Sequence, residues 1–318
     1  MNPDSTTSGQ AGRARRLGGV LAPVLTPFRA DLEPDPGRFA RHCRWLLDHG
    51  CAALAPFGTT SEANSLSIDE RERLLEALLE AGLPAERLVP GTGCCALPDT
   101  VRLTAHAVRH GCSGVLMLPP FYYKGVSDEG LFRAFAEVIE RVADDRLRVY
   151  LYHIPPVAQV GLGPALIERL LRRYPGAIAG MKDSSGDFAG TREVLDRFAG
   201  AGFDVFVGSE RFLLQSLRAG GVGCITATAN VNAAAIDELY RGWRSPDAER
   251  LQEELNAIRA AVEQTPVIPA LKAILAHHAR DAGWATLRPP LVELPAARRE
   301  ALLAELAARG FAMRGLSG

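Results

Sequence analysis

Short apolar runs recur at regular intervals along most of the chain, and each one ends in turn residues. The runs cover residues 18–28, 51–56, 88–91, 114–118, 148–153, 178–182, 204–207 and 222–227. Apolar runs of this length, bounded by turn signals, are typical of strands that are buried on both faces. The pattern therefore predicts eight strands.

Between these runs, apolar residues recur every three or four positions, which is typical of helices that bury one face. Such segments cover residues 36–50, 67–82, 99–110, 127–142, 164–173, 188–199 and 210–219. Ser67 and Glu70 have the spacing of a capping box, which marks a helix start. Strands that alternate with helices form βαβ units and a parallel sheet. Eight units in succession predict an α/β fold of the (β/α)8 TIM-barrel type.

The two ends of the chain differ from this alternating region. After residue 230 only helical patterns remain, at residues 233–242, 247–264, 269–282 and 296–309. Residues 1–17 are rich in Ser, Thr, Gly and Arg and lack the apolar core of a secretory signal. We therefore expect a disordered tail over residues 1–17, a barrel over 18–230 and a C-terminal helical region over 231–318.

Composition excludes several classes of protein. The 318 residues carry a net charge of −1, which gives no electrostatic reason to expect a nucleic acid or a membrane as partner. No apolar run approaches the roughly 18 residues that a membrane-spanning helix needs. The six cysteines show no C-x-x-C spacing, which favours free thiols in a reducing compartment. We therefore expect a cytoplasmic protein that acts on small molecules.

One lysine is a candidate nucleophile. The apolar run 178–182 ends in Lys182, and polar turn residues follow at once. Desolvation at such a strand end lowers the pKa of an ammonium group and frees the amine for Schiff-base chemistry. The alternative is a strand-end lysine in a salt bridge. No G-x-G-x-x-G motif follows the first predicted strand, which counts against a dinucleotide site.

Other polar side chains stand where active groups of a barrel lie, at the carboxyl ends of the strands. They are Thr59, Thr60, Tyr122, Tyr123, Tyr152, His153, Ser209, Glu210 and the stretch 226–230. Hydroxyl groups can relay protons beside an imine, whereas so few carboxylates and histidines suit a metal poorly. We therefore predict neither a metal nor another cofactor. The ordinary alternatives are turn residues with hydroxyl caps and packed or interfacial tyrosines.

Three histidines leave alternatives open. His106 and His110 stand four residues apart on a predicted helix and could share a metal ion. No third ligand is near them in sequence, so we favour two helix-face histidines that are neighbours by chance. His153 follows Tyr152 and either selects substrate or is a packed strand-end histidine.

Several stretches occur in the order in which one enzyme family has them, across residues 18–291. They are Thr26-Pro27-Phe28, Gly58-Thr59-Thr60 with Glu62, Gly91-Thr92-Gly93, Pro120-Phe121-Tyr122, Tyr152 with Pro155, Gly180-Met181-Lys182, Thr228-Ala229-Asn230 and Arg288-Pro289-Pro290-Leu291. With these stretches the chain resembles the dihydrodipicolinate synthase and N-acetylneuraminate lyase family of class I aldolases. The resemblance implies a homo-oligomer, either a dimer or a tetramer.

The resemblance also implies roles for individual residues. Lys182 would form a Schiff base with pyruvate or another 2-oxo acid, and Tyr152 would be the acid/base at the imine. Thr59 and Tyr122 would complete a proton relay, with Tyr122 reaching into the neighbouring subunit. Thr60 would hold the substrate carboxylate.

Further positions bear on the substrate. By resemblance, Ile225 would pack over the pyruvyl group, while Ser184 and the loop with Gly208 and Glu210 would bind substrate hydroxyls. Val157 stands where dihydrodipicolinate synthases carry an arginine that is expected to bind a second carboxylate.

The resemblance and its departures favour a lyase or aldolase that cleaves or forms a 2-oxo-3-deoxy sugar acid or a 4-hydroxy-2-oxo acid. One alternative is a 4-hydroxy-tetrahydrodipicolinate synthase. Two others, from different classes, are a non-catalytic barrel that binds 2-oxo acids and a metal-dependent hydrolase. The hydrolase would need several His or Asp ligands at strand ends, and only His153 stands at such a position.

Overall fold

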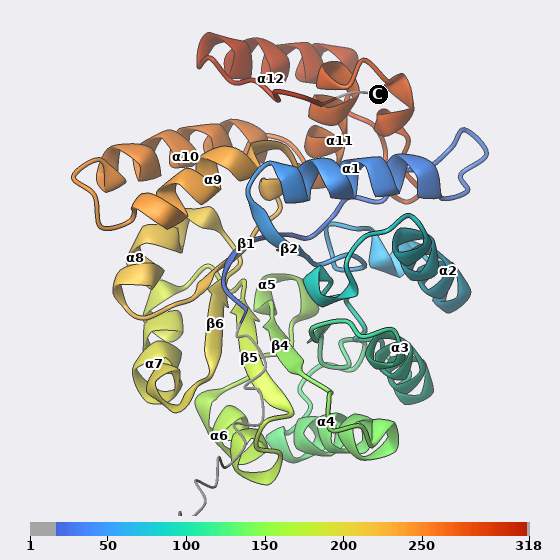
Figure 1. Cartoon of the computed structure of the whole chain (residues 1–318), viewed down its shortest axis with the longest axis vertical. Coiled ribbons are helices and arrows are strands. Elements are labelled where there is room, and N and C mark those ends of the chain that lie inside the picture. Colours follow the sequence, from blue (N-terminus) through green and yellow to red (C-terminus); the bar gives the residue numbers. More distant parts are fainter. Residues whose placement is uncertain (1–16, 317–318) are drawn as a thin grey trace, which may run out of the picture.

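A curled parallel sheet wrapped by helices forms the body of the protein in a computed structural model that describes residues 17–316 (Figure 1). The strands are β1 (Gly19–Ala22), β2 (Cys51–Leu54), β3 (Val115–Met117), β4 (Val149–His153), β5 (Ile178–Asp183), β6 (Asp204–Val207) and β7 (Gly223–Ile225). Their order is β2-β1-β7-β6-β5-β4-β3, and every pair is parallel. The predicted α/β barrel is confirmed.

The helices follow the strands as the sequence pattern predicted. Those around the barrel are α1 (Pro36–Asp48), α2 (Ile68–Glu80), α3 (Leu97–Arg109), α4 (Asp128–Val142), α6 (Pro164–Arg173), α7 (Phe188–Phe198) and α8 (Leu213–Arg218). The capping box at α2 is present, because the Ser67 hydroxyl accepts the Glu70 N–H and the Glu70 carboxylate accepts the Ser67 N–H. One short helix, α5 (Pro155–Ala158), was not predicted.

The predicted third strand, residues 88–91, takes a different form. It makes one bridge to each edge of the sheet and no regular ladder. The N–H of Val89 donates to the carbonyl of Leu54 on β2 at 2.8 Å, and the carbonyl of Pro90 accepts the N–H of Leu116 on β3 at 2.9 Å. Proline has no N–H to extend a ladder. The segment nevertheless joins β2 to β3 and closes the barrel.

The interior of the barrel is filled by side chains. One apolar cluster contains Leu21, Ala53, Ala55, Val89, Leu116, Tyr150, Tyr152, Phe206 and Ile225. Nearly every strand and the closing segment 88–91 supply a member, so this cluster is the inward layer of the barrel. A second, larger cluster packs the strands against the helices. Of the two tyrosines of this layer, Tyr152 lies toward the carboxyl end of β4, whereas the Tyr150 hydroxyl donates to Asp204 at the start of β6 at 3.3 Å.

The last part of the chain is helical and covers one side of the barrel (Figure 1). It consists of α9 (Ala229–Gly242), α10 (Ala248–Glu263), α11 (Val267–His278) and α12 (Ala296–Ala308). In the described part of the chain no helix is long and apolar enough to cross a membrane. The expected disordered tail falls almost wholly on residues 1–16, which lie outside the described residues.

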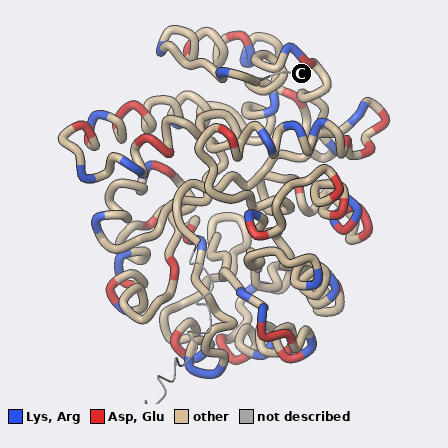
Figure 2. The backbone as a smooth tube through the Cα atoms, in the orientation of Figure 1, with Lys and Arg blue, Asp and Glu red and all other residues tan. Residues whose placement is uncertain are grey.

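Charged residues of both signs alternate along the outer helices and do not gather by sign (Figure 2). This distribution agrees with the net charge of −1.

Closure of the barrel depends on Gly91, so Gly91→Ala should destabilise the protein. A Cβ at this position would lie 2.2 Å from the carbonyl oxygen of Phe57, and that backbone atom cannot give way. We expect a loss of about 2 kcal/mol or more in the free energy of unfolding, measured by urea denaturation. The control is Gly200→Ala, where the added Cβ meets nothing within 4 Å. Equal stabilities of the two variants would contradict the role given to Gly91.

Candidate active site

Lys182 and Tyr152 lie side by side at the carboxyl ends of adjacent strands. They are register partners in the parallel pair of β4 and β5, and each side chain is only 3% exposed. The Lys182 Nζ donates to the Tyr152 hydroxyl at 3.2 Å and lies 4.3 Å from the centre of the ring. The structure thus brings the predicted nucleophile and the predicted acid/base into direct contact in the mouth of the barrel.

Two further hydroxyl groups meet Tyr152. The Thr59 Oγ1, from the loop after β2, lies 3.3 Å from the Tyr152 hydroxyl. The Ser184 side chain, just after β5, also hydrogen-bonds to Tyr152. A continuous path of hydrogen bonds therefore runs from Thr59 through Tyr152 to Lys182.

The surroundings of Tyr152 change its acidity. Burial alone raises the pKa of the phenol, because an ion is poorly solvated inside the barrel. The positive charge of Lys182 and the hydrogen bonds from Thr59, Lys182 and Ser184 act in the opposite direction and outweigh burial. The pKa of Tyr152 is therefore lowered below the ordinary value of 10.0. A phenol that releases its proton more readily is suited to acid/base work.

The three lysines of the chain have different partners. Lys124 donates to the backbone carbonyls of Phe121 and Ala158. Lys272 forms an ion pair with Glu62. Within residues 17–316, Lys182 makes no ion pair with a carboxylate, so the salt-bridge alternative for Lys182 does not hold.

The ion pair of Lys272 with Glu62 is fully buried, with both side chains 0% exposed. Burial raises the pKa of Glu62 and lowers the pKa of Lys272, and the charge of each partner opposes the shift of the other. Lys272 also donates to the carbonyl of Thr286 at 2.8 Å and lies 4.5 Å from the Phe28 ring centre. The Arg288 guanidinium contacts the same ring. Phe28, Glu62 and Arg288 belong to three of the stretches that carry the family resemblance, and all three lie around Lys272. Lys272 was not singled out from the sequence.

This ion pair fixes one end of the loop that carries Thr59 and Thr60. Glu62 has a φ of 56° and Phe57 a φ of 62°, a left-handed backbone that costs non-glycine residues energy. Within the loop, the Ser61 hydroxyl accepts the N–H of Gly58 at 3.2 Å. The Ser61 side chain therefore closes the turn that carries Thr59 and Thr60.

The structure places the residues that were expected to bind substrate at the carboxyl ends of the strands: Ser184 after β5, Gly208 after β6, Ile225 at the end of β7 and Thr60 in the loop after β2. Thr60 lies next to Thr59 in the loop, and Ile225 belongs to the inward cluster with Tyr152. A Cβ at Gly208 would lie 1.9 Å from the Ser184 Oγ, so only glycine allows Ser184 to pack there.

The expectation for Glu210 needs correction. Its side chain is 1% exposed, and its carboxylate accepts the hydroxyls of Thr226 and Thr228 and an N–H of Arg259 at 2.8 Å. The carboxylate is buried among these three donors of the protein itself and is not open to a substrate hydroxyl. Glu210 instead ties β6 to β7 and to α10.

His153 is a packed strand-end histidine. Its Nδ1 accepts the N–H of Leu162 at 3.0 Å. Burial lowers the pKa of His153, and the charge of Asp183 opposes the shift only in part. The neutral ring with its proton on Nε2 is therefore favoured, and the alternative of a substrate-selecting role has no support in these contacts.

The pair Tyr122 and Tyr123, and also Val157, lie apart from the buried hydroxyl groups around Lys182. Tyr122 is 73% exposed and Tyr123 is 72% exposed, and their rings pack edge to face at 5.3 Å. Within residues 17–316 the structure shows no hydrogen bond between Tyr122 and Thr59 or Tyr152. Val157 is 62% exposed on α5.

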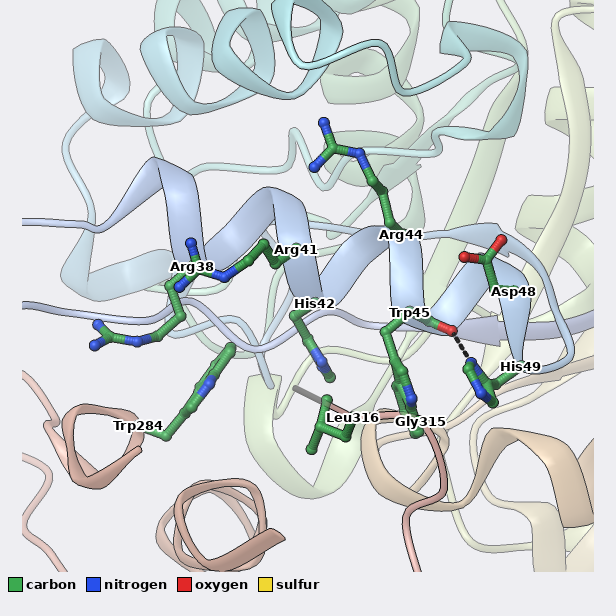
Figure 3. A pocket seen from close by; sticks show the side chains of 10 residues that line it. All are labelled: Arg38, Arg41, His42, Arg44, Trp45, Asp48, His49, Trp284, Gly315 and Leu316. Carbon is green, nitrogen blue, oxygen red and sulfur yellow. Dashed lines mark hydrogen bonds between the residues drawn. The ribbon is translucent and has the colours of Figure 1, made fainter. Parts of the chain in front are cut away.

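A cavity of 230 Å³ lies between α1 and the end of the chain (Figure 3). It is lined by Arg38, Arg41, His42, Trp45 and Trp284, among others, and Leu316 closes one side. None of the candidate site residues lines it, so this cavity is separate from Lys182.

The chain matches the model of the dihydrodipicolinate synthetase family over residues 16–309. It belongs to this family. An uncharacterized DapA-like lyase of Chloroflexus aurantiacus is 34% identical over 281 residues, with 87% of this chain and 91% of the relative covered. A 4-hydroxy-tetrahydrodipicolinate synthase of Acidiphilium cryptum is 33% identical, with 72% of this chain and 76% of the relative covered.

Solved structures agree with the family. Dihydrodipicolinate synthase of Agrobacterium tumefaciens is 30% identical with a TM-score of 0.85, covering 92% of this chain and 99% of its own. YagE of E. coli, solved in complex with pyruvate, is 26% identical with a TM-score of 0.84 and the same coverage. The expectation of a lyase from the Schiff-base-forming class is therefore confirmed at the level of the family.

The buried ion pair of Lys272 with Glu62, at the end of the loop that carries Thr59, leads to a prediction about stability. Lys272→Met should lower the free energy of unfolding by roughly 3–5 kcal/mol at neutral pH, because it leaves the Glu62 charge buried without a partner. Glu62→Gln combined with Lys272→Met should be less destabilised than Lys272→Met alone. Denaturant unfolding measures both differences, and a double variant at least as unstable as the single one would contradict the pairing.

The same variant has a predictable pH dependence. Loss of the Lys272 charge removes the main influence that holds down the pKa of Glu62, which burial raises above 4.5. Folded Lys272→Met then binds a proton at Glu62 more tightly than the unfolded chain does, so its stability falls as the pH rises above 4.5. Its deficit against the wild type should therefore shrink as the pH is lowered.

Proposed function

We propose that Lys182 forms a Schiff base with pyruvate or another 2-oxo acid, and that the enzyme cleaves or forms a carbon–carbon bond through this imine. The observation that carries the proposal is the contact of 3.2 Å between the buried Lys182 Nζ, which has no carboxylate partner, and the Tyr152 hydroxyl. The pyruvate bound to the related YagE supports the choice of substrate class. The hydrogen bonds that link Thr59, Tyr152 and Lys182 support a catalytic aldolase over a barrel that only binds 2-oxo acids.

Imine formation uses the groups around Lys182. The neutral amine attacks the carbonyl carbon of the 2-oxo acid, and the C–N bond forms as the carbonyl electrons move to oxygen. Tyr152 takes a proton from the nitrogen and gives it to this oxygen, and a second proton passed on through Tyr152 lets the oxygen leave as water while the nitrogen lone pair forms the protonated imine. Thr59, hydrogen-bonded to Tyr152, hands protons on.

The carbon–carbon step needs no metal in this scheme. The protonated imine draws electrons, so the C3–C4 bond can break as its electron pair forms an enamine, while a base takes the proton of the C4 hydroxyl. Protonation at C3 and hydrolysis of the imine then release the 2-oxo acid and restore the Lys182 amine. The reverse order gives condensation.

Thr60 and Ile225 orient the 2-oxo acid in this proposal. Thr60, in the turn held by Ser61 and Glu62, is placed to bind the substrate carboxylate with its hydroxyl and backbone N–H. Ile225 packs against the pyruvyl carbons from β7. Fixing both ends of a small substrate places its carbonyl carbon at the Lys182 amine.

The second half of the substrate carries hydroxyl groups in this proposal. Ser184, packed on Gly208, offers a hydroxyl beside Tyr152. The arginine expected of a dicarboxylate-forming synthase is replaced by the exposed Val157. We therefore favour a 2-oxo-3-deoxy sugar acid or a 4-hydroxy-2-oxo acid over the synthase reaction named for the Acidiphilium cryptum relative.

A homo-oligomer, either a dimer or a tetramer, would complete the site. Tyr122, Tyr123 and Val126 form an exposed apolar patch in the loop after β3. Contact of this patch with a second copy would bury it and carry the Tyr122 hydroxyl into the partner's site.

Reductive trapping tests the Schiff base. Borohydride reduction in the presence of pyruvate should add one pyruvyl group per chain, and peptide mass spectrometry should find it on Lys182. With only three lysines in the chain, the assignment is unambiguous. Lys182→Ala should abolish the adduct, and Lys124→Ala is the matched control that should keep it.

Tyr152→Phe separates binding from chemistry. The variant should still be trapped with pyruvate, whereas turnover should fall by about 10²-fold or more if the hydroxyl transfers protons. A panel of 2-oxo acids and 2-oxo-3-deoxy sugar acids gives the substrate. Absence of an adduct with every 2-oxo acid would overturn the proposal, and unchanged turnover of Tyr152→Phe would remove that residue from the mechanism.

Tyr122 and Tyr123 offer a matched pair for the subunit contact, since both are exposed and adjacent. Tyr122→Phe should slow turnover by roughly 10-fold or more by breaking the proton relay, while Tyr123→Phe should not. Sedimentation velocity should show a dimer or tetramer for both variants. A fully active monomer would exclude the role of Tyr122 in a neighbouring subunit.

A further inference from the structure

Three metal-ligating side chains gather on the outer surface between α2 and α3, away from Lys182. His106 and His110 come from α3 and the turn that ends it, and Glu76 comes from α2. One ligand atom of each lies within 4.8 Å of the other two. The third possible ligand, which could not be found near the two histidines in the sequence, is thus Glu76 on the neighbouring helix.

The distances are close to those of a metal site. The Glu76 Oε1 lies 3.6 Å from the His106 Nε2 and 4.0 Å from the His110 Nε2. Ligand atoms at about 2.0–2.1 Å from a tetrahedral ion are about 3.3 Å from one another. Rotation of the exposed Glu76 and His110 side chains would bring their ligand atoms closer to each other and to the His106 Nε2.

The buried member of the cluster has a free nitrogen. His106 is 6% exposed, and its Nε2 has no hydrogen-bond partner among residues 17–316. Burial, followed by the charge of His110, lowers the pKa of His106, although Glu72 and Glu76 oppose this and Arg109 adds to it. The unpartnered Nε2 is available as a metal ligand, because the imidazole nitrogen is among the commonest ligands of Zn²⁺.

A second carboxylate supports the orientation of His106. The Glu72 Oε1 lies 3.8 Å from the His106 Nδ1, on the side of the ring opposite the free Nε2. Metal-bound histidines commonly donate their other ring N–H to a carboxylate. Arg102 holds Glu72 by a hydrogen bond of 3.0 Å and so fixes this second carboxylate in place.

We propose that Glu76, His106 and His110 bind a divalent transition-metal ion that ties α2 to α3, with Glu72 as the outer carboxylate. Two imidazoles and one carboxylate suit Zn²⁺ and its neighbours in the first row, and not Mg²⁺ or Ca²⁺, which prefer oxygen ligands. The exposed side chains of Glu76 and His110 leave room for water at the remaining positions. The proposal is independent of the Schiff-base chemistry at Lys182.

Isothermal titration of the untagged, EDTA-treated protein with ZnCl2 tests the site. We expect one ion per chain, and an affinity that falls by roughly 10-fold or more in His110→Ala and in Glu76→Gln. Both changes are at exposed positions, so the fold should be kept. Zn²⁺ should also raise the melting temperature of the wild type more than that of His110→Ala.

Two control variants exclude other ligands. His277→Ala removes an exposed histidine of α11, and Cys95→Ser removes an exposed thiol, and neither should change the affinity. Trapping of pyruvate should be unaffected by His110→Ala. No binding, or equal binding by all variants, would overturn the proposal. Weakening by His110→Ala without weakening by Glu76→Gln would overturn the role of Glu76.

Discussion

The parallel register of β4 and β5 is the constraint on which the site depends, because it sets Tyr152 beside Lys182. Side chains alternate along a strand, so a slip by one residue would turn the lysine out toward the helices. Thr59 reaches the same phenol from the other side of the barrel only because the segment 88–91 closes the sheet. The hydroxyl path is therefore a consequence of a closed barrel and cannot be built by β4 and β5 alone.

Local pattern was enough to predict most of the fold. The alternation of apolar runs with amphipathic segments gave each regular strand and each long helix, because these elements bury one face or both faces with a fixed period. The same reasoning identified Lys182 and Tyr152, since both stand at strand ends, where barrels place their active groups. The segment around Pro90 shows the limit of this reasoning. An apolar run can close a sheet through two N–H groups and two carbonyls without forming a regular ladder.

Pairings between distant residues could not be predicted in this way. Glu210 had the right position for a substrate ligand, but Arg259 and two threonines occupy its carboxylate. Lys272 lies within an apolar helix, and only its contact with Glu62 gives the charge a role. The hydrophobic period says which face of an element is buried. It does not say which buried charges meet, because that depends on tertiary contacts between residues that are distant in sequence, such as Glu62 and Lys272.

The two buried lysines show how pairing decides chemistry. Both side chains are buried, and the Nζ of each lies over an aromatic ring. The Lys182 Nζ is 4.3 Å from the centre of the Tyr152 ring, and the Lys272 Nζ is 4.5 Å from the centre of the Phe28 ring. A carboxylate beside Lys272 stabilises the ammonium form, which cannot attack a carbonyl, and the pair serves to anchor the Thr59 loop. Among residues 17–316, Lys182 donates to the hydroxyl of Tyr152 and makes no ion pair with a carboxylate, and in the proposed mechanism this hydroxyl exchanges protons with the amine. In the proposed mechanism, the neighbouring carboxylate of Glu62 is therefore what separates the structural Lys272 from the reactive Lys182.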